Sequence, residues 1–274
     1  MSKYKLKSQL ENFLIYHPYN FWVQIRSFFE TKLNNTLKTE LENNKTLRNK
    51  YLGERCFIIG NGPSLRNQDL IKLKGEYIFV TNNFILNERA SDINPSFYCI
   101  IDPMIHNGTF PVERLRDIEK QLSNIKLIFR YASRDFIQKN SLFKNNDVYY
   151  LFDKAVLNEN YLFDMNLDSC IPASINVILS CIISASYMGF SEIYLLGCDA
   201  TLFIPKPEHF YKSTKEEENK KESMEDKLMF ASLMFKGYRI LNEYCTKKGI
   251  KIYNATDGGA LDVFPRVEYE NIVK

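Results

Sequence analysis

Short apolar runs that alternate with longer amphipathic segments dominate the sequence from residue 56 onward. The runs are rich in Ile, Val, Phe and Tyr, a composition that favours buried strands. They stand at residues 56–59, 77–80, 97–101, 125–129, 148–152, 192–196 and 250–253. Helices are predicted between them at residues 64–73, 112–122, 173–188 and 228–248. This alternation predicts an α/β fold, in which a mostly parallel Rossmann-type sheet carries helices on both faces.

The first 55 residues differ from the rest in composition. They hold ten Lys or Arg against five Asp or Glu, with many aromatic side chains between them. We predict a basic helical appendage at residues 1–55 and one catalytic domain at residues 56–274. The appendage either packs on the main domain, which we favour, or lies on anionic lipid as an interfacial helix.

Charge and cysteine usage exclude several classes of protein. A net charge of +3 gives no concentrated basic field for nucleic acid. Six widely spaced cysteines in apolar runs indicate reduced core residues rather than a zinc site. Neither a signal peptide nor a run of ~18 apolar residues is present. A cytoplasmic protein is therefore expected, with peripheral membrane contact through residues 1–55 and homo-oligomerisation left open.

The loop Gly60-Asn61-Gly62-Pro63-Ser64 follows the first predicted strand. Glycines in this position let the backbone approach a ligand, and amides at the start of the following helix can point at an anion. The loop lacks the Gly-Lys-Ser/Thr of a P-loop and the third glycine of the dinucleotide motif. A phosphate loop is predicted, and a tight turn without a ligand is the alternative.

Polar side chains also follow other predicted strands. Asn82 and Asn83 follow the second strand, Asp102 the third, and Asp199 the strand at 192–196. Ligands of open α/β sheets bind at this carboxyl edge. Each residue alone could be a helix cap or turn residue, but their repetition at one edge favours a donor site.

His209 and Tyr211 are the candidate catalytic residues. His209 is one of three histidines and is suited to act as a general base near neutral pH, although it could be an ordinary loop residue. The hydroxyls of Tyr211 and Ser174 could stabilise a phosphate leaving group. Because the chain has no Asp-x-Asp, no metal is expected. A charged segment at 205–227 is predicted to be a lid.

Two blocks of sequence resemble a known superfamily. Residues 57–65, FIIGNGPSL, and residues 185–199, ASYMGFSEIYLLGCD, are similar to the bacterial sialyltransferases of glycosyltransferase family 42. The second block, His209-Phe210-Tyr211 and the closing IYNATDGG at 252–259 also resemble motility-accessory-factor and hydroxymethylpterin-diphosphokinase-like proteins. These matches lie in patches between residues 56 and 274.

The resemblance implies a GT-A-like domain that moves a nonulosonic sugar from a CMP donor without a metal and inverts the anomeric centre. His209 would then be the base and Tyr211 a phosphate contact. Asn61, Gly62, Ser64 and Asn82 or Asn83 would line the donor site, and Asp199 would help to shape it. Together with the residues at the strand ends, the full set of candidate donor-site residues is Gly60, Asn61, Gly62, Pro63, Ser64, Asn82, Asn83, Asp102, Ser174 and Asp199. The sequence departs from the sialyltransferases at Pro172-Ala173-Ser174, where they have Thr-Ser-Gly, and at Asp102, where they have Asn.

Three functions remain as hypotheses. The first is transfer of a sialic-acid-like sugar to a glycan, lipid-linked saccharide or other hydroxyl in surface polysaccharide synthesis. The second is an ATP-dependent pterin diphosphokinase, which would use Mg²⁺ held by Asp102 and Asp199. The third is a nucleotide-binding module without catalysis, docked by its basic N-terminal segment.

Overall fold

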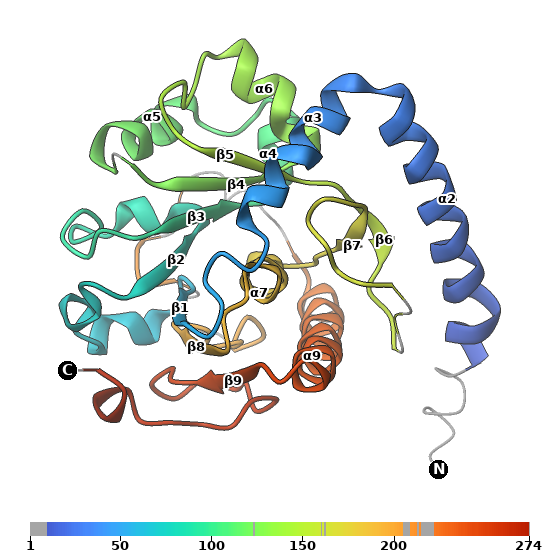
Figure 1. The fold of residues 1–274 in the computed structure, drawn as a ribbon. Coiled ribbons are helices and arrows are strands. Elements are labelled where there is room, and N and C mark those ends of the chain that lie inside the picture. Colours follow the sequence, from blue (N-terminus) through green and yellow to red (C-terminus); the bar gives the residue numbers. More distant parts are fainter. Residues whose placement is uncertain are drawn as a thin grey trace.

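The computed structural model describes residues 10–122, 124–159, 161, 163–204, 209–212, 214 and 222–273. A parallel sheet of seven strands forms its centre (Figure 1). The strands are β1 (Arg55–Ile59), β2 (Tyr77–Thr81), β3 (Phe97–Ile100), β4 (Lys126–Arg130), β5 (Val148–Leu151), β8 (Glu192–Leu196) and β9 (Lys251–Asn254). All seven predicted strands are confirmed.

The strand order is β5-β4-β3-β2-β1-β8-β9. From β1 the chain first builds outward through β2 to β5, and it later returns to place β8 on the other side of β1. Open sheets of this kind have a crevice where the chain reverses its direction of building, at the carboxyl ends of the central strands. That crevice lies after β1 and β8.

Side chains of β1 alternate between two hydrophobic cores. Cys56 and Ile58 belong to one core, and Phe57 and Ile59 to the other; all four are fully buried. Both faces of the sheet are therefore covered, which is why the strands read as continuous apolar runs. All six cysteines are buried and none forms a disulfide, so their prediction as core residues is confirmed.

Helices and short helical turns connect the strands. The α-helices of the main domain are α4 (Pro103–His106), α5 (Val112–Gln121), α6 (Arg134–Lys139), α7 (Val177–Met188) and α9 (Met224–Lys247). The 3-10 turns are η2 (Lys45–Leu47), η3 (Pro63–Asn67), η4 (Leu70–Leu73), η5 (Asn82–Leu86), η6 (Tyr131–Ser133) and η7 (Tyr269–Asn271). Helices α7 and α9 contribute to one core and α5 to the other.

Two helix predictions need correction. The predicted helix at 64–73 is instead the pair of 3-10 turns η3 and η4, because Gln68 adopts an extended backbone and Asp69 starts a new turn. The predicted helix at 173–188 begins only at residue 177, where the Asn176 side chain caps it. Pro172 lies in the strand β7 (Ile171–Ala173), which pairs with β6 (Asp153–Val156) in a small sheet that was not predicted.

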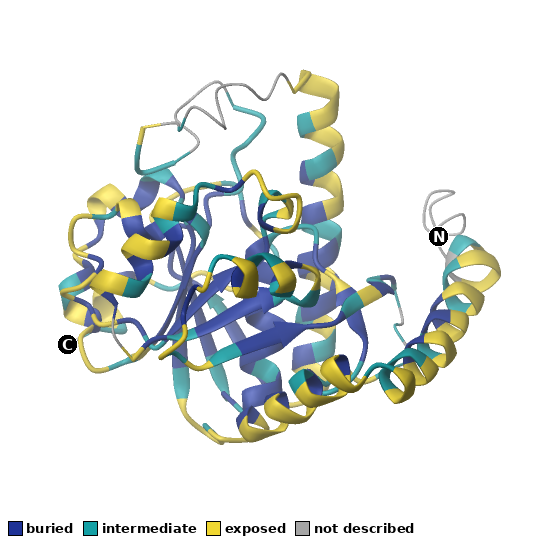
Figure 2. Cartoon of the chain, turned by 90° about the horizontal axis from the view of Figure 1, so that it is seen from above, coloured by how far each residue is buried: buried dark blue, intermediate teal, exposed yellow. Residues whose placement is uncertain are grey.

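The N-terminal segment is helical, as predicted. It comprises a π-helical turn η1 (Asn12–Tyr16), α2 (His17–Leu33) and α3 (Asn35–Asn44). Leu37 and Leu41 of α3 are buried in a core cluster with Phe152. Helix α2 lies beside the small sheet (Figure 1), and Figure 2 shows exposed residues along much of its length.

Two further sequence predictions concern the lid and membrane-spanning helices. Most of the predicted lid at 205–227 falls at 205–208, 213 and 215–221, outside the described residues. In the described part of the chain, no helix combines the length and the apolar character needed to cross a bilayer.

Candidate functional site

The loop after β1 is held against the loop after β8. The Gly62 amide donates to the Gly197 carbonyl at 2.8 Å. Ser64 donates to the Asp199 carboxylate twice, from its amide at 3.2 Å and from its hydroxyl at 2.7 Å. The Ser64 amide, at the start of the turn where a phosphate was predicted to bind, therefore already donates to a carboxylate of the protein.

Close packing between these two loops explains both glycines of the first loop. A Cβ on Gly60 would lie 2.5 Å from the Gly197 carbonyl oxygen, and one on Gly62 would lie 1.8 Å from Asp199 Oδ2. Only glycine fits where backbones approach this closely. The glycines are therefore required by a neighbouring loop of the same protein, whether or not a ligand binds.

Burial raises the pKa of Asp199, while its hydrogen bonds from Ser64 act in the opposite direction. Residues 254–260 cover the same aspartate from the other side. The Ala260 amide donates to the Asp199 carbonyl at 2.7 Å, and the Cys198 amide donates to the Thr256 hydroxyl at 3.1 Å. The closing sequence block is thus part of the support for the site.

A cavity of about 170 Å³ opens at this crevice. Six of the predicted site residues line it: Gly60, Asn61, Gly62, Asn82, Asp199 and His209. Its volume is below the roughly 300–1,000 Å³ typical of small-molecule sites. A nucleotide sugar would therefore extend beyond it.

Asn61 and Asn82, which line this cavity, each have a side-chain oxygen without a hydrogen-bond donor among the described residues. Asn61 Oδ1 and Asn82 Oδ1 are both buried, and no donor for either is found in the part of the chain that the structure describes. Other atoms of both residues form hydrogen bonds. The side-chain nitrogen of Asn61 donates to the Thr81 carbonyl at 3.0 Å, and the backbone carbonyl of Asn82 accepts from the Tyr98 hydroxyl at 2.7 Å. Buried acceptors are normally satisfied, so these two oxygens mark a place for a donor from a ligand or water.

The segment His209-Phe210-Tyr211 is hydrogen-bonded to the loop after β1 and to the turn η3 that follows it. The Phe210 amide donates to the Asn61 carbonyl at 2.9 Å, and Arg66 Nε donates to the Phe210 carbonyl at 2.9 Å. The rings of His209 and Tyr211 stack with centroids 4.8 Å apart. The structure thus brings His209 to the cavity wall.

Tyr211 lies beside a second cavity of about 370 Å³, which Arg66 and Arg89 also line. The Tyr211 hydroxyl accepts from Asn83 Nδ2 at 3.1 Å, and Asn83 Oδ1 accepts from Arg114 at 3.0 Å. Asn83 therefore contacts Tyr211 and does not line the first cavity.

Four other predicted site residues lie outside the first cavity. Pro63 begins the turn η3, and Ser64 holds Asp199. Asp102 caps α4 by accepting from the Met104 amide at 2.9 Å. The Ser174 carbonyl accepts from Arg130 at 2.7 Å. Whether these residues contact a donor stays a prediction.

Sequence reasoning missed some residues that line the cavity, notably Asn176 and Tyr238. Asn176 caps α7 through its oxygen, while its Nδ2 donates to the Tyr238 hydroxyl at 3.1 Å. An Asn just before a long apolar run is a cap signal that could have identified its position. Nothing in the local sequence indicates that Tyr238 of α9 reaches it.

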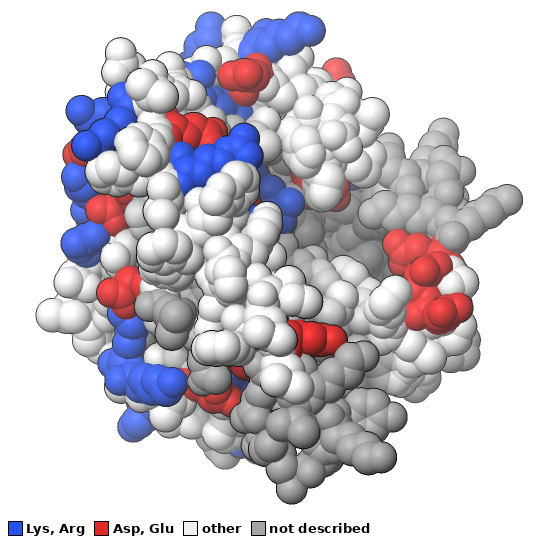
Figure 3. All heavy atoms as spheres, turned by 90° about the vertical axis from the view of Figure 1, so that its right-hand side faces the viewer, with Lys and Arg blue, Asp and Glu red and all other residues white. Residues whose placement is uncertain are grey.

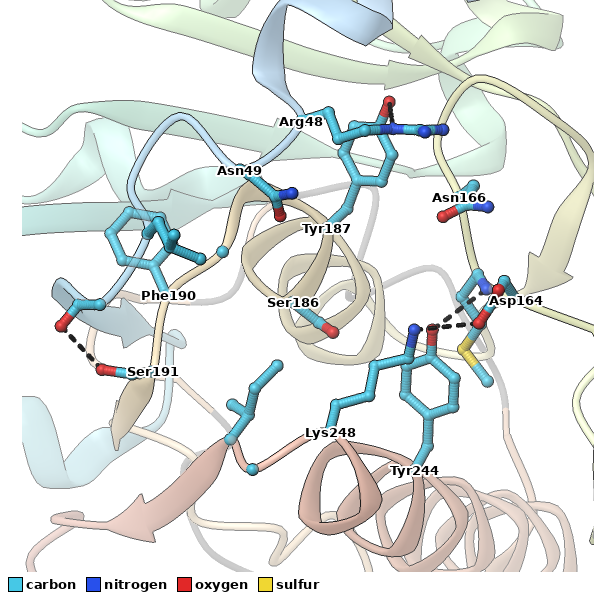
Figure 4. Close-up of a pocket in the computed structure, with 16 residues that line it drawn as sticks. Arg48, Asn49, Asp164, Asn166, Ser186, Tyr187, Phe190, Ser191, Tyr244 and Lys248 are labelled. Carbon is cyan, nitrogen blue, oxygen red and sulfur yellow. Dashed lines mark hydrogen bonds and ion pairs between the residues drawn. The ribbon is translucent and has the colours of Figure 1, made fainter.

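A larger cavity, of about 660 Å³, lies at the opposite edge of the sheet. It is lined by residues just before β1, β8 and β9, and Figure 4 shows it between the end of α7 and the end of α9. Its cations are already paired: Lys248 contacts Asp164 at 2.9 Å and Arg48 contacts Asp168 at 2.9 Å. We place the candidate site at the carboxyl edge, where Asn61, Asn82 and His209 line one cavity.

Comparison with known proteins places the fold. The profile of a family described as 6-hydroxymethylpterin diphosphokinase MptE-like matches residues 30–202. The MAf glycosyltransferase from Magnetospirillum magneticum AMB-1 is similar in structure, with a TM-score of 0.51 and 18% identity over 87% of this chain. The matched region is 39% of the length of that protein.

Two structures of sialyltransferase CstII, one of them described as from Campylobacter jejuni, also match, with TM-scores of 0.47. Their identities are 14% and 16%, over 79% and 78% of this chain and 85% and 86% of theirs. A search of the curated proteins finds no match. The α/β fold predicted from the sequence is confirmed, and so is the predicted resemblance to hydroxymethylpterin-diphosphokinase-like proteins.

Proposed function

The chain belongs to the 6-hydroxymethylpterin diphosphokinase MptE-like family, and within that family we propose that it acts as a glycosyltransferase rather than a diphosphokinase. It transfers a nonulosonic, sialic-acid-like sugar from a CMP donor to a hydroxyl of a glycan or lipid-linked saccharide, with inversion and without a metal. The fold it shares with the MAf glycosyltransferase is consistent with this reaction.

One observation carries the proposal. Asn61 and Asn82, whose Oδ1 atoms are buried and find no donor in the described part of the chain, line a cavity that His209 also lines. Such a pair suits a ligand that offers N–H or O–H donors, as the amino group of cytosine and the ribose hydroxyls do. A candidate general base beside two such acceptors is an arrangement that sugar transfer can use.

In the proposed reaction, His209 takes the proton of the acceptor hydroxyl while that oxygen attacks the anomeric carbon. The bond from that carbon to the phosphate oxygen breaks, and CMP leaves with its electron pair. The Tyr211 hydroxyl, held by Asn83 at 3.1 Å, would donate to the leaving phosphate. Stacking of Tyr211 on His209 would keep the general base and the tyrosine hydroxyl at a fixed distance from each other.

The diphosphokinase alternative takes its support from the family description. That chemistry uses carboxylates to hold Mg²⁺ against the phosphates of ATP. The two candidates, Asp199 and Asp102, are each engaged by backbone amides, Asp199 at Ser64 and Asp102 at Met104. Each carboxylate thus has a structural role within the protein, and sugar transfer without a metal requires neither of them as a ligand.

A thermal-shift panel of CMP, CDP, UDP, GDP and ATP, each with Mg²⁺ or with EDTA, tests the donor. A ligand that binds only the folded state raises the melting temperature, and the effect grows with the logarithm of its concentration relative to its Kd. We expect CMP to stabilise the protein equally with and without Mg²⁺. Stabilisation by ATP with Mg²⁺ alone would overturn the proposal in favour of the diphosphokinase.

His209→Ala tests the catalytic role. We expect loss of transfer by at least about 100-fold, because a general base commonly contributes that much, with CMP affinity nearly unchanged. His106→Ala is the matched control, since His106 is exposed at the end of α4. Full turnover by His209→Ala, measured with a CMP-sugar, would remove His209 from this role.

A further inference from the structure

Helix α2 packs on the body through its polar side. Its buried residues are Asn20, Val23 and Ser27. Asn20 Nδ2 donates to the Val156 carbonyl at 2.9 Å and to Asn158 Oδ1 at 2.8 Å, and Asn20 Oδ1 accepts from the Val156 amide at 2.8 Å. Specific hydrogen bonds therefore fix which side of the helix faces the small sheet.

The outward side of α2 is apolar. Positions three, four and seven apart share one side of a helix, and here they carry large side chains with exposures from 44% at Ile25 to 85% at Leu33. The set comprises Phe21, Trp22, Ile25, Phe28, Phe29 and Leu33. Figure 3 faces the side where α2 lies, and uncharged side chains cover much of its middle. Contiguous exposed apolar surface of this kind marks an interaction site.

The charges of α2 divide between its two sides. Its single carboxylate, Glu30, is directed to Lys154 of the small sheet at 2.8 Å. The cations Arg26 and Lys32 lie at the apolar side, Arg26 over the Trp22 ring at 5.3 Å and Lys32 over the Phe28 ring at 4.3 Å. The outward side of α2 thus combines aromatic residues with cations and has no acid.

We propose that this outward side of α2 binds the surface of a lipid bilayer that carries anionic headgroups. Bulky apolar side chains enter the boundary between headgroups and acyl chains, Trp22 sits at headgroup level, and the stems of Arg26 and Lys32 let their charges reach phosphate. A second copy of the chain fits less well, because facing α2 helices would bring cations against cations. This proposal does not depend on the identity of the sugar donor.

Co-sedimentation of the full chain with vesicles tests the proposal. We expect binding to vesicles of phosphatidylcholine with phosphatidylglycerol, and much weaker binding to phosphatidylcholine alone. Trp22→Ser/Phe29→Ser should weaken binding about 100-fold or more, because two large apolar side chains no longer leave water. Arg26→Gln/Lys32→Gln should weaken binding to the anionic vesicles about 30-fold, and added salt should reduce wild-type binding.

Leu52→Ser/Leu86→Ser is the control. It also removes two exposed apolar side chains, with exposures of 75% and 41%, from other parts of the surface. We expect it to bind like the wild type, and all variants should keep the same circular dichroism spectrum because the substituted residues are exposed. Equal binding to both vesicle types, or an equal loss in the control, would overturn the proposal. The proposal would also be overturned if the wild type forms a dimer that does not bind vesicles, while Trp22→Ser/Phe29→Ser is a monomer.

Discussion

Asp199 holds the loop at residues 60–64 through its side chain. Its carboxylate accepts from the amide and hydroxyl of Ser64, and its position leaves no room for a side chain at residue 62. A carboxylate of the protein therefore organises the loop before any ligand arrives. Such preorganisation lowers the entropy cost of binding a donor.

Gly62→Ala tests this arrangement. The new Cβ would lie 1.8 Å from Asp199 Oδ2 and 2.6 Å from the Gly197 carbonyl oxygen, so the loops must separate. We expect a loss of about 2–3 kcal/mol in unfolding free energy, as for overpacking in a core, measured by urea denaturation.

Gly75→Ala is the control for that substitution. Gly75 has a φ of +95° but nothing within 4 Å of an added Cβ, so backbone strain alone should cost about 1–2 kcal/mol. Gly62 has an ordinary φ of −66°. If Gly62→Ala proves milder than Gly75→Ala, contact with Asp199 does not explain the glycine.

At the scale of single residues, the sequence predicted which residues lie together at the site but not all the contacts that they form. Asn61, Asn82, Asp199 and His209 meet at one cavity because parallel strands bring their carboxyl ends to one edge. The bond between Ser64 and Asp199 joins residues 135 positions apart. No local pattern encodes a pairing at such a separation.

At the scale of elements, Arg130 joins the main sheet to the small sheet. It ends β4, contacts Asp153 of β6 at 3.0 Å and donates to the carbonyl of Ser174, just after β7, at 2.7 Å. Burial raises the pKa of Asp153 to about 6, and the charge of Arg130 opposes this shift. The Asp153 carboxyl of this junction therefore changes its charge near pH 6.

Asp153→Asn should change how stability depends on pH. A carboxyl whose pKa is raised in the folded state binds its proton more tightly there than in the unfolded chain. Ionisation above about pH 6 therefore costs stability, and the proton returns as pH falls. Between pH 7 and pH 5, wild type should gain about 1 kcal/mol of unfolding free energy relative to Asp153→Asn.

Urea denaturation at both pH values measures that difference. Asp135→Asn serves as the control, because its side chain is 98% exposed and the same loss of charge should leave the pH dependence almost unchanged. An identical pH dependence in wild type and Asp153→Asn would mean that Asp153 is already ionised at pH 5.

The strands of the main sheet were predictable from the sequence, whereas the small sheet and the bounds of two helices were not, for a physical reason. Buried parallel strands require continuous apolar runs, and those runs are visible. The start of α7 depends on the cap at Asn176, and residues 171–173 pair with β6, a partner distant in the sequence. Tertiary pairing of this kind overrides the local preference of Pro172 for the first turn of a helix.

At the scale of the whole molecule, the N-terminal helices differ in how they join the body. Asn44, at the end of α3, is fully buried, and its Nδ2 donates to the carbonyls of Tyr150 and Leu167 at 2.8 and 2.7 Å. Residues beyond it also bond to the end of α7, the Tyr51 amide to the Met188 carbonyl at 2.9 Å. Helix α2 buries only Asn20, Val23 and Ser27.

We therefore expect α3 to unfold with the sheet and α2 to open alone. In Asn20→Ala, amide hydrogen exchange should become faster only in residues 17–33, because only the contacts of Asn20 with Val156 and Asn158 are lost. Asn44→Ala should speed exchange in the protected sheet as well, since two buried carbonyls lose their donor at a cost of about 1–3 kcal/mol. If Asn44→Ala instead affects only residues 10–54, the whole N-terminal segment is a separate folding unit. Independent opening of α2 would let it bind a lipid surface without disturbing the crevice after β1 and β8.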